Sequence, residues 1–431
     1  MTGSISQNPE TDKMRIAVVG TGAAGLTAAW LLQRKHRIDL YEKNHYIGGH
    51  TRTRILQDGP DAGTPIDTGF IVMNHANYPL LTKILDQLKI PLGDSDMSFS
   101  FHCEQTGYAY AGTNLGSLFV QRSNLWNGSH WRMLIDILRF NASAIQNLSE
   151  GHLSEWTLGI YLAQKRYSRA FKEQYLFPMC SAIWSASTEK IESFPAQSVL
   201  QFFDNHGLLS INKRPQWKYV KDGSHEYVKA MLKTIKGKKN LNTPIEKIFR
   251  HENQVILHLK DGSSRTYDAV VVGTHADEAL ELLGDASPQE ERLLGAWKYQ
   301  TNETVLHTDP SVMPPLQCSW ASWNFRRNHH DRPETPVSVT YDMNRLQQPN
   351  TQEKYFVTLN NKTRLAASKI IDQTTFTHPI NSFQAMATQD KLPLLNGVKN
   401  TYFCGSYFGY GFHEDAVCSA VNIAKEFGIY V

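Results

Sequence analysis

Three glycines and one glutamate near the start of the chain have the types and spacing needed to hold a dinucleotide. Gly20, Gly22 and Gly25 follow the apolar run Arg15–Val19 and precede a stretch of good helix formers. Gly20 would let the chain turn sharply, Gly22 would admit a pyrophosphate, and Gly25 would let the helix pack on the sheet. Glu42 ends the next apolar run, where a carboxylate accepts hydrogen bonds from a ribose. A plain turn would explain the glycines alone, but strand, helix and acid together favour a dinucleotide site.

The residues beside these four extend the predicted site. The N–H groups of Ala23 and Ala24, at the start of the helix, would face the phosphates. The carboxylate of Glu42 would repel the extra phosphate of NADP, and we place Lys43 beside it among the cofactor-binding residues.

A second glycine pair indicates which dinucleotide is bound. Gly48 and Gly49 come shortly after Glu42 and are followed by His50, Thr51, Arg52 and Thr53. The glycines would let the backbone pass close to a second part of an extended cofactor, while polar and basic side chains meet phosphate oxygens. A dehydrogenase that binds only NAD has no need of this second contact.

These motifs resemble those of the FAD-containing amine-oxidase superfamily, which carries a GxGxxG loop, an acid at the second strand end and then Gly-Gly-Arg. His50 stands where that arginine is usual, so either Arg52 takes over the phosphate contact or His50 makes a weaker one. The resemblance implies that Gly69, Phe70 and Ile71 skirt the flavin ring. It also implies that the main chain at Ile245 brackets adenine and that Gly273 lies near the diphosphate.

The last thirty residues match the same superfamily. A strand runs into Gly405 and Ser406, an aromatic and glycine-rich loop follows, and a helix is expected to begin near Asp415. In the superfamily this helix, here with Ala416 and Val417 in its first turn, points its positive end at the flavin. Asp415 replaces a usual glycine and is expected to serve as the N-cap. Both ends of the chain therefore predict FAD.

The whole chain from Arg15 onward is most similar to bacterial flavoproteins that resemble the N-terminal domain of plant cyclopropane-fatty-acid synthases. The motifs that carry this likeness are Asp67–Val72, Ser95–Phe99, Phe177–Trp184, Phe202–Leu208, Arg214–Trp217 and Gly409–Asp415. That branch is associated with the modification of unsaturated phospholipid acyl chains.

The expected fold class is α/β, with a Rossmann-type FAD-binding domain interleaved with a mixed α+β substrate domain of the amine-oxidase type. We assign 14–95, 218–290 and 395–431 to the FAD-binding domain, 96–217 and 291–394 to the substrate domain, and 1–13 to a disordered tail.

The substrate domain is rich in apolar side chains, from which we hypothesise a tunnel for an acyl chain. Its predicted walls are Leu134, Ile137, Leu138, Asn141, Ile145, Leu148, the segment 175–184, Trp297, Trp320, Trp323 and Phe325. Taken singly, each of these residues is more often core than tunnel wall.

Amine oxidases of this superfamily often hold a lysine near flavin N5. The corresponding stretch Tyr299–His307 contains no lysine, and Lys298 precedes it. Hydride transfer from a C–H bond needs mainly the flavin and correct positioning, and His413 and Glu414 are candidates for acid–base help. Structural packing or capping would equally explain these two residues.

The expected function is therefore an FAD-dependent oxidoreductase that desaturates a lipid acyl chain, or moves its double bond, by hydride transfer to flavin N5. The alternatives are amine oxidation and a non-catalytic FAD-bound partner of an acyl-modifying enzyme.

Composition limits the remaining possibilities. The net charge of +3 is too small to imply a nucleic-acid partner, and the five cysteines show no spacing typical of zinc sites or disulfide scaffolds, so no metal is expected. No apolar run reaches the ~18 residues that span a bilayer. We expect a cytoplasmic protein, and the oligomeric state stays open. The basic stretches 326–332 and 233–239 could meet anionic phospholipid in a peripheral membrane contact, but runs of this kind are more often solvated surface.

Overall fold

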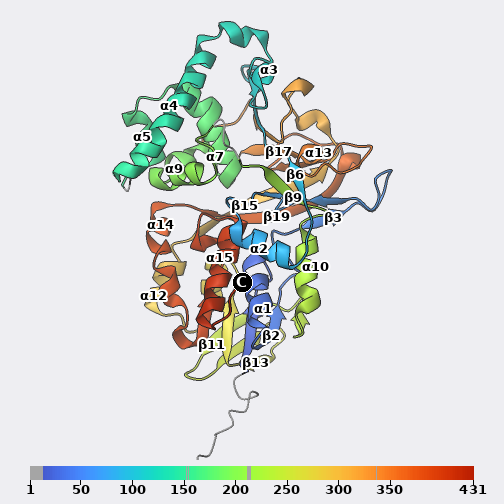
Figure 1. Ribbon diagram of the computed structural model, residues 1–431, viewed down its shortest axis with the longest axis vertical. Coiled ribbons are helices and arrows are strands. Elements are labelled where there is room, and N and C mark those ends of the chain that lie inside the picture. The colour runs from blue at the N-terminus through green and yellow to red at the C-terminus, as the bar shows by residue number, and fades with distance from the viewer. Residues whose placement is uncertain (1–12, 152, 154, 211–214, 336) are drawn as a thin grey trace, which may run out of the picture.

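The computed structural model describes residues 13–151, 153, 155–210, 215–335 and 337–431. The expected tail, apart from Lys13, and Arg214 of the quoted motif lie outside these residues. A five-stranded sheet forms the centre of the lower half of the molecule (Figure 1). Its strands, all parallel, are β10 (Lys239–Asn240), β2 (Arg37–Tyr41), β1 (Arg15–Val19), β14 (Ala269–Val272) and β20 (Thr401–Phe403), in that order.

Both faces of this sheet are covered, which explains why β1 and β14 are apolar almost throughout. Helices α1 (Ala23–Leu32), α10 (His225–Thr234) and α15 (His413–Glu426) share one buried cluster with one face of the sheet. An antiparallel sheet of β11 (Ile245–Arg250), β12 (Val255–Leu259) and β13 (Ser264–Tyr267) shares a second cluster with the other face. All ten residues of α1 are buried, so this helix lies in the middle of the domain.

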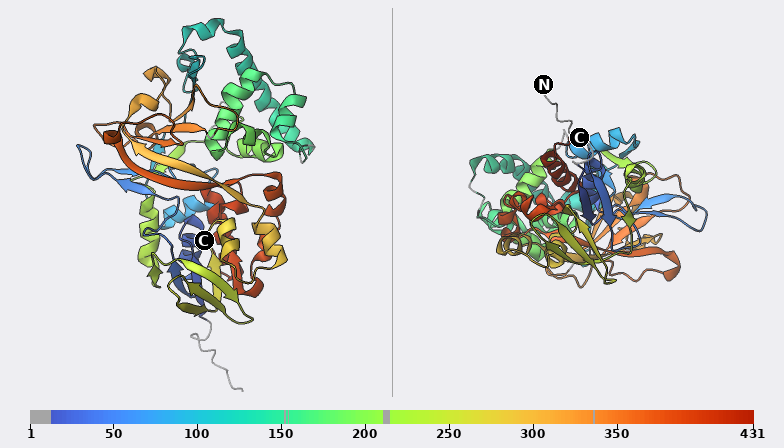
Figure 2. Two further views of the ribbon diagram at one scale, coloured as in Figure 1. Left: turned by 180° about the vertical axis from the view of Figure 1, so that it is seen from behind. Right: turned by 90° about the horizontal axis from the view of Figure 1, so that it is seen from below.

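A seven-stranded sheet lies above the first (Figures 1 and 2). Its order is β19 (Ile370–Ile380), β15 (Lys298–His307), β18 (Phe356–Leu359), β17 (Ser338–Asp342), β16 (Trp323–Arg327), β7 (Phe99–Cys103) and β8 (Ala109–Ala111). The long strands β15 and β19 pair over almost their whole length and run between the two halves of the molecule.

Shorter elements complete the two halves of the molecule. They are the β3–β4 hairpin (Thr53–Ile55, Pro65–Asp67), the sheet β5–β9–β6 (Val72–Met73, Trp217–Val220, Leu92–Ser95), α2 (Pro79–Gln87), α11 (Ala276–Leu282), α12 (Pro288–Leu294), α13 (Met343–Leu346) and α14 (Phe383–Gln389).

A group of helices forms the end of the molecule opposite the five-stranded sheet (Figure 1). It contains α3 (Leu115–Leu118), α4 (Gly128–Glu150), α5 (Leu158–Gln164), α6 (Arg169–Phe171), α7 (Phe177–Trp184), α8 (Thr188–Glu192) and α9 (Ala196–Asn205). Its core is a buried cluster rich in aromatic rings, among them Phe140, Phe171 and Phe203. None of the helices built from the described residues combines the length and apolarity needed to cross a bilayer.

The fold class is the one expected, an α/β nucleotide-binding domain interleaved with a mixed domain. The first helix begins directly after the glycine turn, and β11 begins at Ile245. The last helix differs from the prediction, because it begins at His413 rather than at Asp415.

Candidate active site

The glycine loop after β1 forms an open cradle. Gly20 has φ +89°, a left-handed conformation that a side chain would strain. A Cβ on Gly25 would lie 2.0 Å from the carbonyl oxygen of Gly20, so the helix packs against the turn as predicted. A Cβ on Gly22, by contrast, would meet no protein atom within 4 Å. Gly22 therefore faces free space, which is the room that a pyrophosphate needs.

The start of α1 supplies the matching donors. Gly22 is the N-cap of α1 and offers no side-chain acceptor, and the first turn contains no acidic residue. Ala23 and Ala24 form that first turn and are buried. A helix N-terminus without a cap binds an anion through its free N–H groups and its dipole. The residues present thus fit the phosphates of a dinucleotide.

Glu42 lies against the same turn. Its carboxylate accepts hydrogen bonds from the backbone N–H and the hydroxyl of Thr21, at 3.1 and 2.5 Å, and from the backbone and side chain of Asn44. Only 7% of the residue is exposed. The N–H of Thr243 donates to the carbonyl of Glu42, so the turn that leads to Ile245 lies beside the acid. A ribose contact at Glu42 stays a prediction, and the position of the carboxylate suits it.

Two predicted phosphate ligands have other partners. Lys43 forms an exposed ion pair with Glu278 of α11 at 2.5 Å. Arg52 forms an ion pair with Asp372 of β19 at 2.7 Å. The long strand β19 thus brings Arg52 a carboxylate that no local pattern could reveal, and its phosphate contact stays a prediction.

The second glycine pair meets the first loop. Gly49 has φ +58°, and a Cβ there would lie 3.1 Å from the Cα of Gly22. A Cβ on Gly69 would lie 2.0 Å from the carbonyl oxygen of His50. The N–H of Phe70 donates a hydrogen bond to the same oxygen. On the other side of the loop, a Cβ on Gly273 would lie 2.8 Å from the Cα of Gly25. Gly49 and Gly273 therefore contact the glycine loop directly, and Gly69 and Phe70 are joined to it through His50.

The His50 ring contacts strand β19, and the weaker phosphate contact considered for this residue stays a prediction. Its Nε2 lies 3.1 Å from the carbonyl oxygen of Thr377 on β19, and its ring packs on Phe376 with centroids 4.8 Å apart. Burial and the neighbouring histidines hold its pKa well below the ordinary value. The ring is therefore neutral and points toward the substrate domain.

Two further histidines lie beside His50, and the sequence analysis did not predict either of them as a site residue. The ring centroids of His378 and His275 lie 5.3 and 5.9 Å from that of His50. His275 stacks on Tyr299 at 4.5 Å, and its Nδ1 lies 3.1 Å from the hydroxyl of Thr377. Burial lowers the pKa of His275, and it lowers that of His378 to about 4. These three residues, which we call the histidine cluster, thus form a neutral polar surface between the two domains.

His413 is the first residue of α15 and the fourth histidine of the candidate site. Its Nε2 lies 2.8 Å from the hydroxyl of Tyr227 and 3.0 Å from that of Thr51. Its ring stacks on Phe70, with centroids 3.8 Å apart and an angle of 12° between the planes. Burial lowers the pKa of His413 to about 3, so the imidazole is neutral. Ile71, next to Phe70, is buried in the substrate-domain cluster.

Glu414 and Asp415 both serve backbone groups. The two oxygens of Glu414 accept the N–H groups of Leu80 and Leu81 at 2.8 and 3.0 Å, and so cap helix α2. Asp415 is the third residue of α15, not its N-cap, and accepts the N–H groups of Phe412 and Tyr410 at 2.8 and 3.0 Å. Burial raises the pKa of Asp415 to about 6 and that of Glu414 above its ordinary value. Glu414 thus has a structural function, and a catalytic one stays a prediction.

The remaining predicted residues of the C-terminal segment lie close by. Gly405 donates its N–H to the hydroxyl of Ser419, and a Cβ on it would lie 2.4 Å from the ring of Tyr407. Ser406 begins a single 3₁₀ turn, and Ala416 and Val417 are buried in the first turns of α15.

Comparisons with known proteins agree with this geometry. The model of the family described as flavin containing amine oxidoreductase matches residues 23–348. The chain belongs to this family. It is therefore an FAD-dependent oxidoreductase.

Solved structures of similar fold cover almost the whole chain. A fatty acid isomerase from P. acnes that produces CLA has 16% identity and a TM-score of 0.66, covering 98% of this chain and 100% of that one. Cyclohexylamine oxidase from Brevibacterium oxydans IH-35A has 15% identity and a TM-score of 0.68, covering 96% and 100%. A putative protoporphyrinogen oxidase from Exiguobacterium sp. 255-15 has 15% identity and a TM-score of 0.68, covering 96% and 98%. A search of curated protein sequences finds no match.

The structure shows the position of Lys298, the candidate for the lysine that amine oxidases of this family often hold near flavin N5. Lys298 is the first residue of β15 and its side chain is exposed. The residues that follow it toward the histidine cluster are Tyr299, Gln300 and Asn302, and the last of these donates to Nδ1 of His378 at 2.8 Å. Lys298 is the one lysine of β15 and lies four residues before Asn302, at the exposed start of the strand.

The predicted tunnel walls do not line one cavity. Trp297 is fully buried in the nucleotide domain, Phe325 lies in the core of the seven-stranded sheet, and Trp320 packs on a third cluster. Leu138 and Ile145 are 54% exposed, so they face outward. The tunnel prediction is wrong for these residues, because α4 is apolar on more than one face and periodicity alone could not tell the faces apart.

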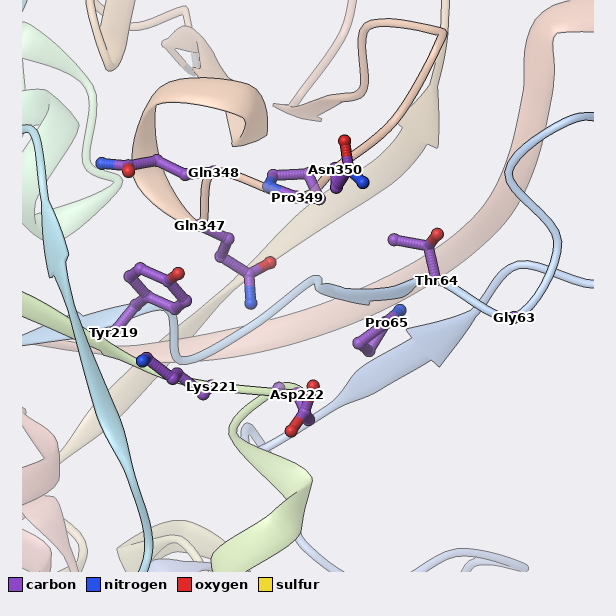
Figure 3. Close-up of a pocket in the computed structure, with 11 residues that line it drawn as sticks. Gly63, Thr64, Pro65, Tyr219, Lys221, Asp222, Gln347, Gln348, Pro349 and Asn350 are labelled. Atoms are coloured by element: carbon purple, nitrogen blue, oxygen red, sulfur yellow. The ribbon is translucent and has the colours of Figure 1, made fainter.

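A separate hollow of about 410 Å³ lies beside the hairpin β3–β4 (Figure 3). Its walls include Thr64, Tyr219 and Gln347, and Figure 3 shows the amide of Gln347 directed into it. That amide also holds the buried carboxylate of Asp67, which Thr53 and Ser224 bond from other sides. Burial raises the pKa of Asp67 to about 7. The hollow has polar walls and contains none of the predicted cofactor residues.

Proposed function

We propose that this enzyme oxidises, or shifts the double bond of, an uncharged hydrocarbon chain carried by a lipid. The observation that carries the proposal is the neutrality of the surface between the domains. The histidine cluster and His413 have neutral imidazole rings. The rings of Phe70, Phe376 and Tyr299 pack against them and form the apolar part of this surface.

An ammonium substrate would find little to bind here. Carboxylates near this surface already have partners. Glu414 caps α2, Asp415 bonds the α15 backbone, and Asp372 pairs with Arg52. Glu278, whose charge acts on His275, pairs with Lys43. A buried cation needs a paired anion, whereas a hydrocarbon needs none. The exposed position of Lys298 also argues against the lysine arrangement of amine oxidases.

The residues divide the work as follows. FAD, when bound, supplies the hydride acceptor. The glycine cradle, the start of α1 and Glu42 would hold the nucleotide part, and the positive end of α15 would favour negative charge on the ring. The histidine cluster offers neutral nitrogens that could hold or pass a proton beside the reacting carbon. The three rings are half-buried between the domains, which reduces their contact with water.

The fatty acid isomerase among the similar structures supports a lipid substrate. Cyclohexylamine oxidase has the same fold, so the fold does not choose between substrates. A third possibility is that the FAD-bound protein assists a separate acyl-modifying enzyme.

The test uses purified protein loaded with FAD and kept free of oxygen. We expect unsaturated phospholipid in detergent to bleach the yellow flavin absorbance or to return with a displaced double bond, while primary amines leave both unchanged. Bleaching by amines alone would overturn the proposal in favour of amine oxidation. If a partner enzyme gains activity while neither class reacts, the accessory function replaces it.

A further inference from the structure

The outer face of helix α4 exposes an unusual number of large apolar side chains. Ile135, Leu138 and Ile145 are each 54% exposed and Trp131 is 45% exposed. In the segment before the helix, Trp126 is 90% exposed. Of the large apolar side chains exposed on the described part of the chain, half lie between residues 115 and 145.

These side chains form one stripe that the core does not use. Residues 131, 135, 138 and 145 follow helical spacing along one face of α4. The opposite face already buries Met133, Phe140 and Ala144. Figures 1 and 2 show α4 at the end of the molecule farthest from the five-stranded sheet, with its outer side uncovered. Monomeric proteins rarely leave such contiguous apolar surface without a partner.

The charge around the stripe is positive. Between residues 115 and 150 the charged residues are Arg122, Arg132, Arg139, Asp136 and Glu150, with a net charge of +1. Asp136 is fully buried and is held by both neighbouring arginines and by the N–H of Ser168. Lys165 and Arg166 add exposed positive charge nearby. Within the described residues, neither Arg122 nor Arg166 has an acidic side chain within ion-pair distance.

We propose that this surface, made of Trp126, Trp131, Ile135, Leu138 and Ile145 with its rim of basic residues, docks the enzyme on an anionic lipid bilayer. Tryptophan and aliphatic side chains enter the interfacial region, while arginines meet lipid phosphates at its edge. The inference deepens the proposed function and rests on it, because a lipid substrate must be collected from a membrane. It also replaces the basic stretches 326–332 and 233–239 as the expected contact.

The direct test is cosedimentation of the full-length, FAD-loaded protein with vesicles. One vesicle contains phosphatidylcholine only and the other contains phosphatidylcholine with phosphatidylglycerol. We expect binding to the anionic vesicle to exceed binding to the neutral one at least tenfold. The variant Trp126→Ser/Ile135→Ser/Leu138→Ser should lose roughly tenfold or more in partition coefficient. Arg122→Gln/Arg166→Gln should lose roughly fivefold per charge.

The control is Leu394→Ser/Val398→Ser, which removes two exposed apolar side chains from the segment that precedes β20. It should bind vesicles like the unchanged protein. Equal loss in the control, no loss in the α4 variant, or no binding by the unchanged protein would each overturn the proposal. A concentration-dependent dimer that the α4 variant abolishes would assign the surface to a second copy instead.

Failure of this inference and failure of the proposed function are separable. Vesicle binding needs no turnover, and the flavin reaction is measured on lipid in detergent, which needs no docking. Vesicle binding without any reaction on lipid would leave the surface intact and overturn only the chemistry.

Discussion

Gly22 and Gly25 stand three residues apart in the same loop, yet a methyl group would meet different surroundings at each. At Gly22 it would enter free space, and at Gly25 it would strike the carbonyl of Gly20. We expect Gly22→Ala to change the free energy of unfolding of the cofactor-free protein by less than about 0.5 kcal/mol and to weaken FAD binding at least tenfold. Thermal melting of the cofactor-free protein and FAD titration measure the two effects.

Gly25→Ala is the companion change. Its overlap with the Gly20 carbonyl should destabilise the fold by about 1–3 kcal/mol even without cofactor. If Gly22→Ala bound FAD as tightly as the unchanged protein, the phosphates would not lie at this loop.

Lys298 provides a second test at this scale. Because its side chain is exposed at the start of β15, we expect Lys298→Met to leave the rate of flavin reduction within about twofold. Rapid-mixing absorbance measures that rate. A loss of a hundredfold or more would restore the lysine arrangement of amine oxidases.

At the scale of elements, Glu414 joins two helices. It lies in the first turn of α15 and caps the start of α2 with both carboxylate oxygens. Glu414→Ala should cost about 1 kcal/mol in unfolding free energy and speed amide exchange at Leu80 and Leu81. Glu414→Gln keeps one acceptor and should cost less. Turnover that falls sharply in Glu414→Gln, with stability nearly unchanged, would instead make Glu414 a catalytic acid or base.

The sequence predicted the local elements well and the convergence of distant ones poorly. The turn at Gly20–Gly25 is encoded within six residues, so strand, loop and helix could be predicted together. The histidine cluster could not, because His50 and His378 meet only after β19 has paired with β15. The sequence did place two polar residues, Thr377 and His378, on this strand. Their partner, His50, is more than three hundred residues away in the sequence, so the contact could not be predicted. The ion pair of Arg52 could not be predicted for the same reason, since Asp372 lies on that strand.

At the scale of the molecule, the free energy of unfolding depends on pH because neutral histidines are buried. His307 is fully buried, its Nδ1 accepts the N–H of Asp309 at 3.1 Å, and burial lowers its pKa to about 4. Between about pH 4 and 6.5 the unfolded chain binds the proton that the folded chain refuses, so His307 removes stability as pH falls through this range.

His307→Gln should therefore reduce the slope of unfolding free energy between pH 6 and 5 by about 1 kcal/mol per pH unit. Urea melts at both pH values measure it. The exposed His329, replaced by Gln, serves as control and should leave the slope unchanged. Equal slopes in His307→Gln and the unchanged protein would mean that His307 titrates normally in the folded state.

The architecture as a whole places a neutral surface between a nucleotide domain and a helical end whose outer face suits a membrane. The most direct measurement of the central claim is the position and number of double bonds in the acyl chains of an unsaturated phospholipid. It is made by mass spectrometry after oxygen-free incubation with the FAD-loaded enzyme. We predict chains with a new or displaced double bond, absent when FAD is omitted. Unchanged chains, together with a flavin that a primary amine bleaches, would contradict the account.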